Sequence, residues 1–153
     1  MGIYWDMATS AELLRQSIAG YEPRLRAISG AAASANPRGA PAWSPKQELG
    51  HLIDSATNNR VRFVRATLEG AYDGPSYDGR GWVELAGYAD MPWRDVIALW
   101  QQLNLALAAL LDRIPEARFS APCVIASEQS GTLDLVIQDY IRHMRHHLDH
   151  ILA

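Results

Sequence analysis

The chain has 153 residues, of which 48% are hydrophobic and 20% are charged, and its formal net charge is −3 at pH 7. This composition is typical of a folded globular protein and excludes disordered and collagen-like chains. The weak negative charge gives no general attraction for phosphate backbones, which excludes nucleic acid as a principal partner.

The sequence has no signal for a membrane or for export. Its longest apolar run, residues 105–111, is far shorter than the roughly 20 residues that cross a bilayer. The first residues lack the basic and apolar regions of a secretory leader, and Asp6 stands where N-myristoylation requires Ser or Thr. Cys123 is the only cysteine, so no internal disulfide can form. We therefore expect one cytoplasmic domain over residues 1–153 with no membrane partner.

The first half of the chain predicts two amphipathic helices. The first begins at Thr9 or Ser10, either of which can cap a helix, and Pro23 inside it predicts a kink. Residues 29–42 are mostly small residues, Pro and Gly, and are expected to form a surface loop. The second helix has a strong start signal, with N-cap, proline and capping-box positions filled in order by Ser44, Pro45 and Gln47.

The second half predicts two more helices. Residues 70–82 are rich in Gly, Pro and Asp and are expected to be irregular before a short helical turn. The third helix begins near Pro92, ends at Pro115 and carries an apolar stripe. Residues 116–131 return across the surface to Thr132, which caps the fourth helix. No stretch shows sustained strand-like alternation, so we expect an all-α four-helix bundle with long crossover loops.

Four of the five histidines lie in the fourth helix, between residues 141 and 151. On a helical wheel, His143 and His147 lie nearest the apolar stripe, and their i, i+4 spacing places them about 5 to 6 Å apart on one face. That spacing suits two ligands of one metal ion, and it equally suits a partly exposed pair. His146 and His150 form a second such pair that points further from the core. A metal site therefore requires a third ligand.

The fifth histidine, His51, lies on the second helix opposite the apolar stripe, on a face that it shares with Asp54, Ser55, Asn58 and Arg62. Periodicity alone sends this face to solvent. However, residues 51–59 contain no Lys or Glu, and their short polar side chains would also suit a wet internal cleft. The residues leave both interpretations open.

Three stretches together resemble the DinB-like superfamily, and within it the YfiT-like branch of metal-dependent hydrolases and bacillithiol transferases. The matching residues of the three stretches are Trp43, His51, Leu52, Asp54, Ser55, Asn58, Arg62 and Phe63; Tyr77, Asp78 and Trp82; and Tyr140, His143, His146, His147 and His150. Their order and spacing agree with the family from about residue 10 to the end. The resemblance implies an up-down-down-up bundle in which His51, His143 and His147 hold a divalent metal ion.

Imidazole ligands favour zinc or nickel over iron and manganese. Three histidines leave a coordination position open, as in catalytic sites, so the catalytic group would be a metal-bound water or thiolate. Water there, with its pKa lowered to about 7, would make the protein a hydrolase of a small molecule. A small thiol would make it an S-transferase of stress or detoxification chemistry. A non-catalytic, metal-stabilised interaction module is the third alternative.

The substrate cleft is expected to contain residues of the second helix and of the following connection, namely Asp54, Asn58, Arg62, Tyr77 and Trp82. Arg62 would hold a carboxylate or phosphate of the ligand. The sequence predicts no role for Cys123, His146 or His150. The tryptophans, including Trp5, leave room for a homodimer interface that the sequence does not locate.

Overall fold

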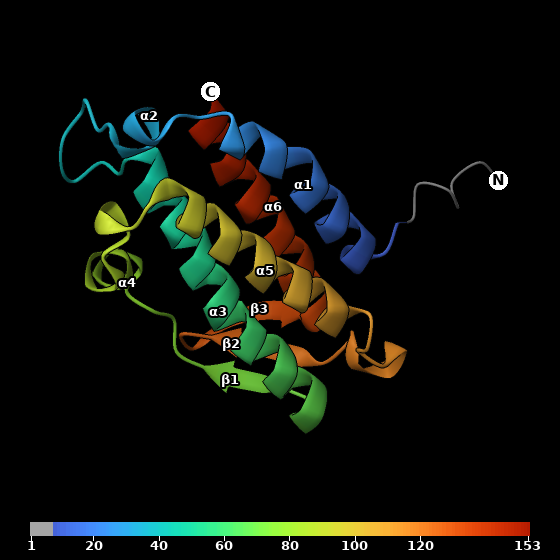
Figure 1. The fold of residues 1–153 in the computed structure, drawn as a ribbon. Helices are drawn as coiled ribbons and strands as arrows, with labels where there is room; N and C mark the ends of the chain where they lie inside the picture. Colours follow the sequence, from blue (N-terminus) through green and yellow to red (C-terminus); the bar gives the residue numbers. More distant parts are fainter. Residues whose placement is uncertain (1–7) are drawn as a thin grey trace.

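The computed structural model describes residues 8–153, so Trp5 and Asp6 lie outside the described residues. Its four long helices are α1 (Ser10–Arg26), α3 (Pro45–Glu69), α5 (Trp93–Leu111) and α6 (Leu133–Leu152). Helices α1 and α6 run in one direction and α3 and α5 in the other (Figure 1). This confirms the all-α four-helix bundle and the expected up-down-down-up order.

The helix starts follow the capping signals. The Thr9 and Ser44 hydroxyls each accept a hydrogen bond from the backbone N–H of the third helical residue, whose own side chain accepts one from the backbone N–H of the capping residue, so both capping boxes are complete. The Thr132 hydroxyl accepts from the backbone N–H of Leu135 at the start of α6. These local interactions satisfy backbone donors that would otherwise lack a partner in the first turn.

The connections contain more regular structure than the sequence predicts. A short helix, α2 (Gly30–Ser34), forms behind the N-cap Ser29 within the expected loop. A three-stranded sheet joins β1 (Tyr72–Gly74), β2 (Pro122–Ile125) and β3 (Glu128–Thr132), with β1 parallel to β2 and β2 antiparallel to β3. The prediction that residues 70–82 are irregular is wrong at β1, and the sequence did not predict β2 and β3 in the connection before α6, because strands of three to five residues are too short to show alternation.

The remaining elements are α4 (Gly79–Ala86) and the 3-10 turns η2 (Tyr88–Asp90) and η3 (Glu116–Arg118). Helix α4 matches the short helical turn expected after the connection that follows α3. Helix α4 and η2 both lie against α3. They therefore cover part of the face that carries His51.

Four helix–helix contacts build the core, because α1 and α3 each pack against both α5 and α6. Trp100 of α5 is fully buried, whereas the preceding Leu99 is 43% exposed. None of the helices in residues 8–153 combines the length and apolar character that a membrane span requires. The contact between α3 and α6 brings the histidines of both helices to one place.

Candidate metal centre

Helices α3 and α6 bring His51, His143 and His147 into one cluster. One nitrogen of each ring can be chosen so that all three lie within 4.8 Å of one another. The His51 ring centroid lies 5.4 Å from that of His143 and 5.0 Å from that of His147, and the two α6 rings are 4.5 Å apart. All three side chains are partly buried. His143 and His147 lie one turn apart on α6, and the packing of α3 against α6 adds His51.

The surroundings of His51 keep its ring neutral. The Trp43 ring lies against it with centroids 4.9 Å apart, and Gly79 lies beside it, where a Cβ would be 3.7 Å from Nδ1, an ordinary van der Waals contact. Burial, followed by the nearby charges of His147 and His143, lowers the pKa of His51 to about 4. Burial also lowers the pKa of His143. At neutral pH both rings therefore have the uncharged form that binds metal.

Glu48 orients the imidazole ring of His147. Its carboxylate lies 2.8 Å from Nδ1 of His147 and 2.8 Å from Nδ1 of His150, and the residue is only 6% exposed. Burial raises the pKa of Glu48, but the hydrogen bonds from the two histidines outweigh it and hold the pKa below its usual value. The ionised carboxylate can only accept, so Nδ1 of His147 donates and its Nε2 has a lone pair to offer. The sequence interpretation missed Glu48, although it lies one turn before His51 on the same face of α3.

The histidines fit a divalent ion. Nε2 of His147 lies 3.1 Å from Nε2 of His143. Two nitrogens that bind one tetrahedral ion at about 2.0 to 2.1 Å each are separated by about 3.3 Å, close to this distance. Moreover, Nδ1 of His51 is buried and has no hydrogen-bond partner within residues 8–153. A buried polar atom without a partner requires an explanation, and a bound ion is one.

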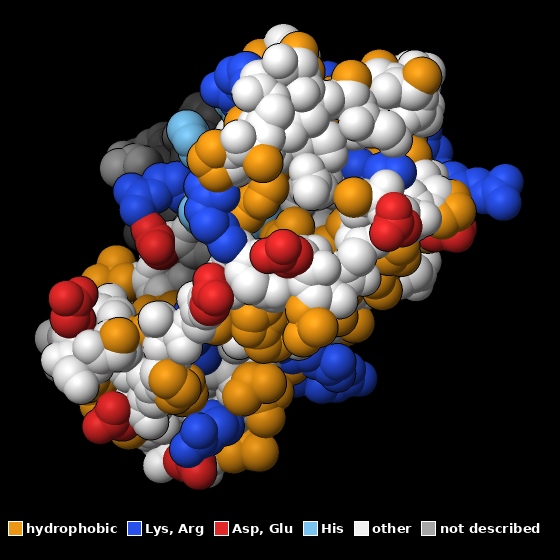
Figure 2. Space-filling view, turned by 90° about the vertical axis from the view of Figure 1, so that its left-hand side faces the viewer, with side chains coloured by type: hydrophobic (Ala, Val, Ile, Leu, Met, Phe, Trp, Pro, Cys, Tyr) orange, Lys and Arg blue, Asp and Glu red, His pale blue; other side chains and the backbone are white. Residues whose placement is uncertain are grey.

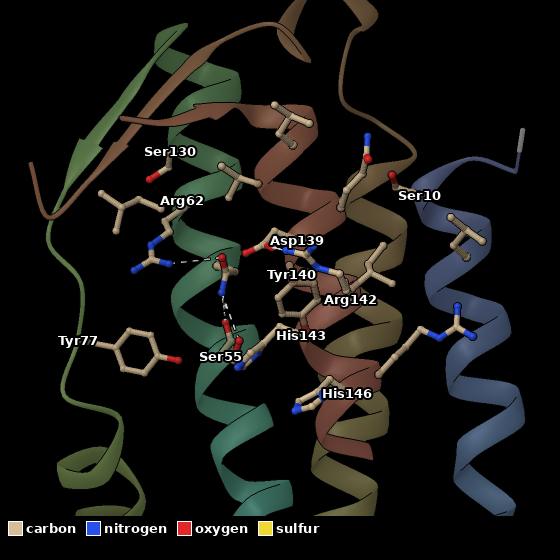
Figure 3. A pocket seen from close by; sticks show the side chains of 18 of the residues that line it. Ser10, Ser55, Arg62, Tyr77, Ser130, Asp139, Tyr140, Arg142, His143 and His146 are labelled. Carbon is tan, nitrogen blue, oxygen red and sulfur yellow. Dashed lines mark hydrogen bonds and ion pairs between the residues drawn. The ribbon is translucent and has the colours of Figure 1, made fainter. Parts of the chain in front are cut away.

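A cavity of about 1200 Å³ opens beside this cluster. On the face shown in Figure 2, histidine side chains reach the surface next to Lys or Arg side chains. Figure 3 shows His143 on α6 opposite Ser55 on α3, with Arg62 and Tyr77 on the same side of the cavity. The cavity is therefore lined by polar groups of α3 and α6 and by His143 of the cluster.

The structure separates the predicted cleft residues into two groups. Arg62 and Tyr77 line the cavity. Asp54 is 4% exposed and accepts a hydrogen bond of 2.6 Å from the Tyr88 hydroxyl, so it faces η2 and not the cavity. The Asn58 amide donates to the Asp54 carbonyl of its own helix, and Trp82 packs against Tyr77 with ring centroids 5.6 Å apart. Neither is among the residues that line the cavity.

Two neighbouring residues line the cavity where Asp54 and Asn58 were expected. Ser55 and Asn59 line the cavity from α3, each one position further along the helix. His146 also lines it, His150 is held by Glu48, and Cys123 is buried in β2. A step of one residue turns a helical side chain by about 100°, which is enough to exchange the residue that faces the cavity.

The metal-free protein is expected to lose stability in mild acid. The unfolded chain takes up a proton on His51 near the ordinary pKa of 6.5, whereas the folded chain does so only near 4. Between these values the unfolded state binds more protons, so the free energy of unfolding should fall by about 1 kcal/mol between pH 7 and pH 5.5. Urea unfolding of the metal-stripped protein measures this change. An equal fall in a His51→Gln variant would show that another group causes it.

Residues 13–151 match the DinB superfamily. Over 110 residues the chain is 28% identical to YfiT of Bacillus subtilis strain 168, which is named a candidate metal-dependent hydrolase, and the match covers 71% of this chain and 62% of that protein. It is also 28% identical over 112 residues to a similarly named protein of Bacillus licheniformis, covering 72% of this chain and 64% of the relative. The chain thus spans less than two thirds of the length of both curated relatives.

Two solved structures share the fold. That of YfiT from Bacillus subtilis, described as a probable metal-dependent hydrolase with an unusual four-helix bundle topology, has a TM-score of 0.81 at 24% identity and covers 93% of this chain and 81% of that one. That of a mycothiol-dependent maleylpyruvate isomerase has a TM-score of 0.73 at 14% identity and covers 93% and 62%. With its sequence match over nearly all of the described residues and with this topology, the chain belongs to the DinB superfamily.

Proposed function

We propose that this chain is a divalent-metal-dependent hydrolase of a small molecule, in which His51, His143 and His147 hold the ion. One observation carries the proposal: three imidazoles from two helices converge beside a large cavity, and within the described residues no cysteine, carboxylate or further histidine joins their cluster. Closed structural zinc sites use four protein ligands, whereas catalytic sites keep a position open. The donor set therefore favours catalysis over a purely structural role.

The surroundings of the three histidines keep their rings in the form that binds a metal ion. Burial keeps His51 and His143 uncharged, and Glu48 holds the proton of His147 on Nδ1, so that Nε2 stays available. Zinc or nickel suits such ligands. When bound, the ion would supply Lewis acidity that polarises a substrate carbonyl and makes water more acidic. Tyr77 and Ser55 line the cavity with hydroxyl groups that can orient the substrate.

A low-molecular-weight-thiol S-transferase is the second candidate, and the size of the cavity favours it. A volume of about 1200 Å³ exceeds the roughly 300 to 1000 Å³ of a typical single-ligand pocket. It has room for a thiol beside an electrophile. In such a transfer the sulfur bonds to the electrophilic carbon, the leaving group departs with the bonding electrons, and the thiol proton passes to solvent. One structural neighbour is named as mycothiol-dependent, which agrees with this chemistry.

A two-part assay of untagged, zinc-loaded protein tests the proposal. We expect hydrolysis within a panel of p-nitrophenyl esters without added thiol, and loss of that hydrolysis in His143→Ala. Turnover of 1-chloro-2,4-dinitrobenzene only when glutathione is present, also lost in His143→Ala, would replace the hydrolase with the S-transferase. Absence of both activities in protein that contains metal would favour the non-catalytic module.

A further inference from the structure

Two arginines of the cavity wall, Arg62 and Arg145, form no ion pair within residues 8–153. Arg142 pairs with Asp139, and Asp149 accepts a hydrogen bond from Tyr21, so the acidic residues of the cavity wall already have partners. Of these two arginines, Arg145 is exposed, whereas Arg62 is partly buried. A partly buried guanidinium without an anion has an unused capacity to bind one.

The contacts of Arg62 hold its position without using its full hydrogen-bonding strength. Nη1 lies 3.5 Å from Oδ1 of Asn59 and Nη2 lies 3.4 Å from the carbonyl of Pro75. Both distances are longer than the usual 2.7 to 3.2 Å, so these bonds are weak. The guanidinium lies 5.9 Å from the centre of the Tyr77 ring. Arg62 is thus kept at the cavity wall by neutral groups that an anion can outcompete.

Tyr77 adds a second donor from the facing connection. It lines the same cavity, and in Figure 3 its hydroxyl points toward Ser55 and His143. Burial is the main cause of the raised pKa of Tyr77, and the phenol therefore keeps its proton at neutral pH. Arg62 and Tyr77 together present a charged fork and a hydroxyl, which is a common arrangement for a carboxylate or phosphate.

The spacing along α3 sets the length of a ligand that could use both sites. The guanidinium lies level with Asn59, which follows His51 by eight residues. A rise of 1.5 Å per residue places the guanidinium about 12 Å along the helix from the backbone of His51 and about 6 Å from that of Ser55, which lies opposite His143. A ligand that reaches both the histidines and the guanidinium must therefore be longer than acetate.

We infer that Arg62, together with Tyr77, whose hydroxyl lies on the side of the histidines, forms an anion subsite for ligands that carry a carboxylate or phosphate at the end away from the three histidines. This inference rests on the proposed function, because the histidines must hold the ion that binds the other end of the ligand. It adds a substrate class to that function. The subsite explains why an arginine without an acidic partner lies in the cavity wall.

Calorimetric titration of the zinc-loaded protein tests the inference with three thiol probes. The first, 8-mercaptooctanoate, has a thiol for the ion and a carboxylate at the end of a long chain. The second, 8-mercaptooctan-1-ol, has the same length without the charge, and the third, 2-mercaptoethanol, is a short uncharged thiol that reports binding to the ion alone. The variants are Arg62→Gln and Arg60→Gln, the latter removing an exposed arginine of the same helix. Zinc content is measured in every sample.

We expect the wild type and Arg60→Gln to bind the long carboxylate at least about tenfold more tightly than the long alcohol, which is about 1.4 kcal/mol. Arg62→Gln should lose this preference while its zinc content and its affinity for the short probe stay unchanged. No preference in the wild type, or an equal one in Arg62→Gln, would overturn the subsite and leave the metal centre intact. Protein that holds no zinc and binds no thiol would overturn the proposed function, and the subsite with it. Phosphate-ended probes of the same length then distinguish between the two kinds of anion.

Discussion

Replacing His147 with alanine is expected to lower the affinity of the protein for zinc by more than about a hundredfold, because ligand loss should cost more than loss of a group that only orients a ligand. His147 contributes the nitrogen 3.1 Å from that of His143, and its removal leaves one ring from each helix. It also deprives the buried Glu48 carboxylate of one of its two histidine partners. Competition with a chelator of known affinity, using metal-stripped protein, measures the change.

His146→Ala is the matched control for this prediction. His146 is the preceding residue of α6, is exposed, and lines the cavity without belonging to the cluster of three. Its replacement should leave zinc affinity close to that of the wild type. Equal losses in the two variants would mean that the ion binds to the histidine-rich helix in general rather than to the cluster between α3 and α6.

Glu48→Gln is expected to weaken zinc binding by about 10- to 100-fold, although Glu48 is not a member of the histidine cluster. The carboxylate keeps the proton of His147 on Nδ1. A glutamine of nearly the same size has no negative charge, and its amide can donate to Nδ1, which would favour a proton on Nε2, where the ion must bind. The same chelator competition measures the loss.

Two further variants separate orientation from general electrostatics. Glu69→Gln removes an exposed acidic charge from the end of α3, where it pairs only with Arg65, and should not change zinc affinity. His150→Ala removes the other partner of Glu48 and should cost less than Glu48→Gln, since His147 keeps its hydrogen bond. If Glu48→Gln bound zinc as the wild type does, the ring of His147 would need no acidic partner.

The parts of the site that the sequence predicts well are those that depend on one helix. The pair of His143 and His147 follows from a spacing of one turn, and the capping residues Thr9, Ser44 and Thr132 mark helix starts through contacts within four residues. Such interactions have the same geometry wherever the helix lies in the fold. The long helices were therefore predictable in type and in their starting residues, whereas α5 ends at Leu111, before the predicted end at Pro115.

The rest depends on contacts between distant segments. Periodicity alone sends His51 to solvent, and only the packing of α3 against α6, which the family resemblance implied, brings it to the other two rings. The role of Glu48 was missed for the same reason, because its partners His147 and His150 are 99 and 102 residues away in the sequence. The sequence pattern predicts Asp54 as a cleft residue, but η2 places Tyr88 where its hydroxyl donates a hydrogen bond to Asp54. No spacing rule within one helix contains this information.

Elemental analysis of the untagged protein, purified beside its His51→Ala variant, tests the central claim most directly. His51 is the single member of the cluster that α3 contributes, so its loss separates a centre shared by two helices from one that α6 forms alone. The account predicts about one zinc or nickel ion per chain in the wild type and a large loss in the variant. No bound metal in the wild type, even after reloading, or equal metal in both proteins, would contradict it.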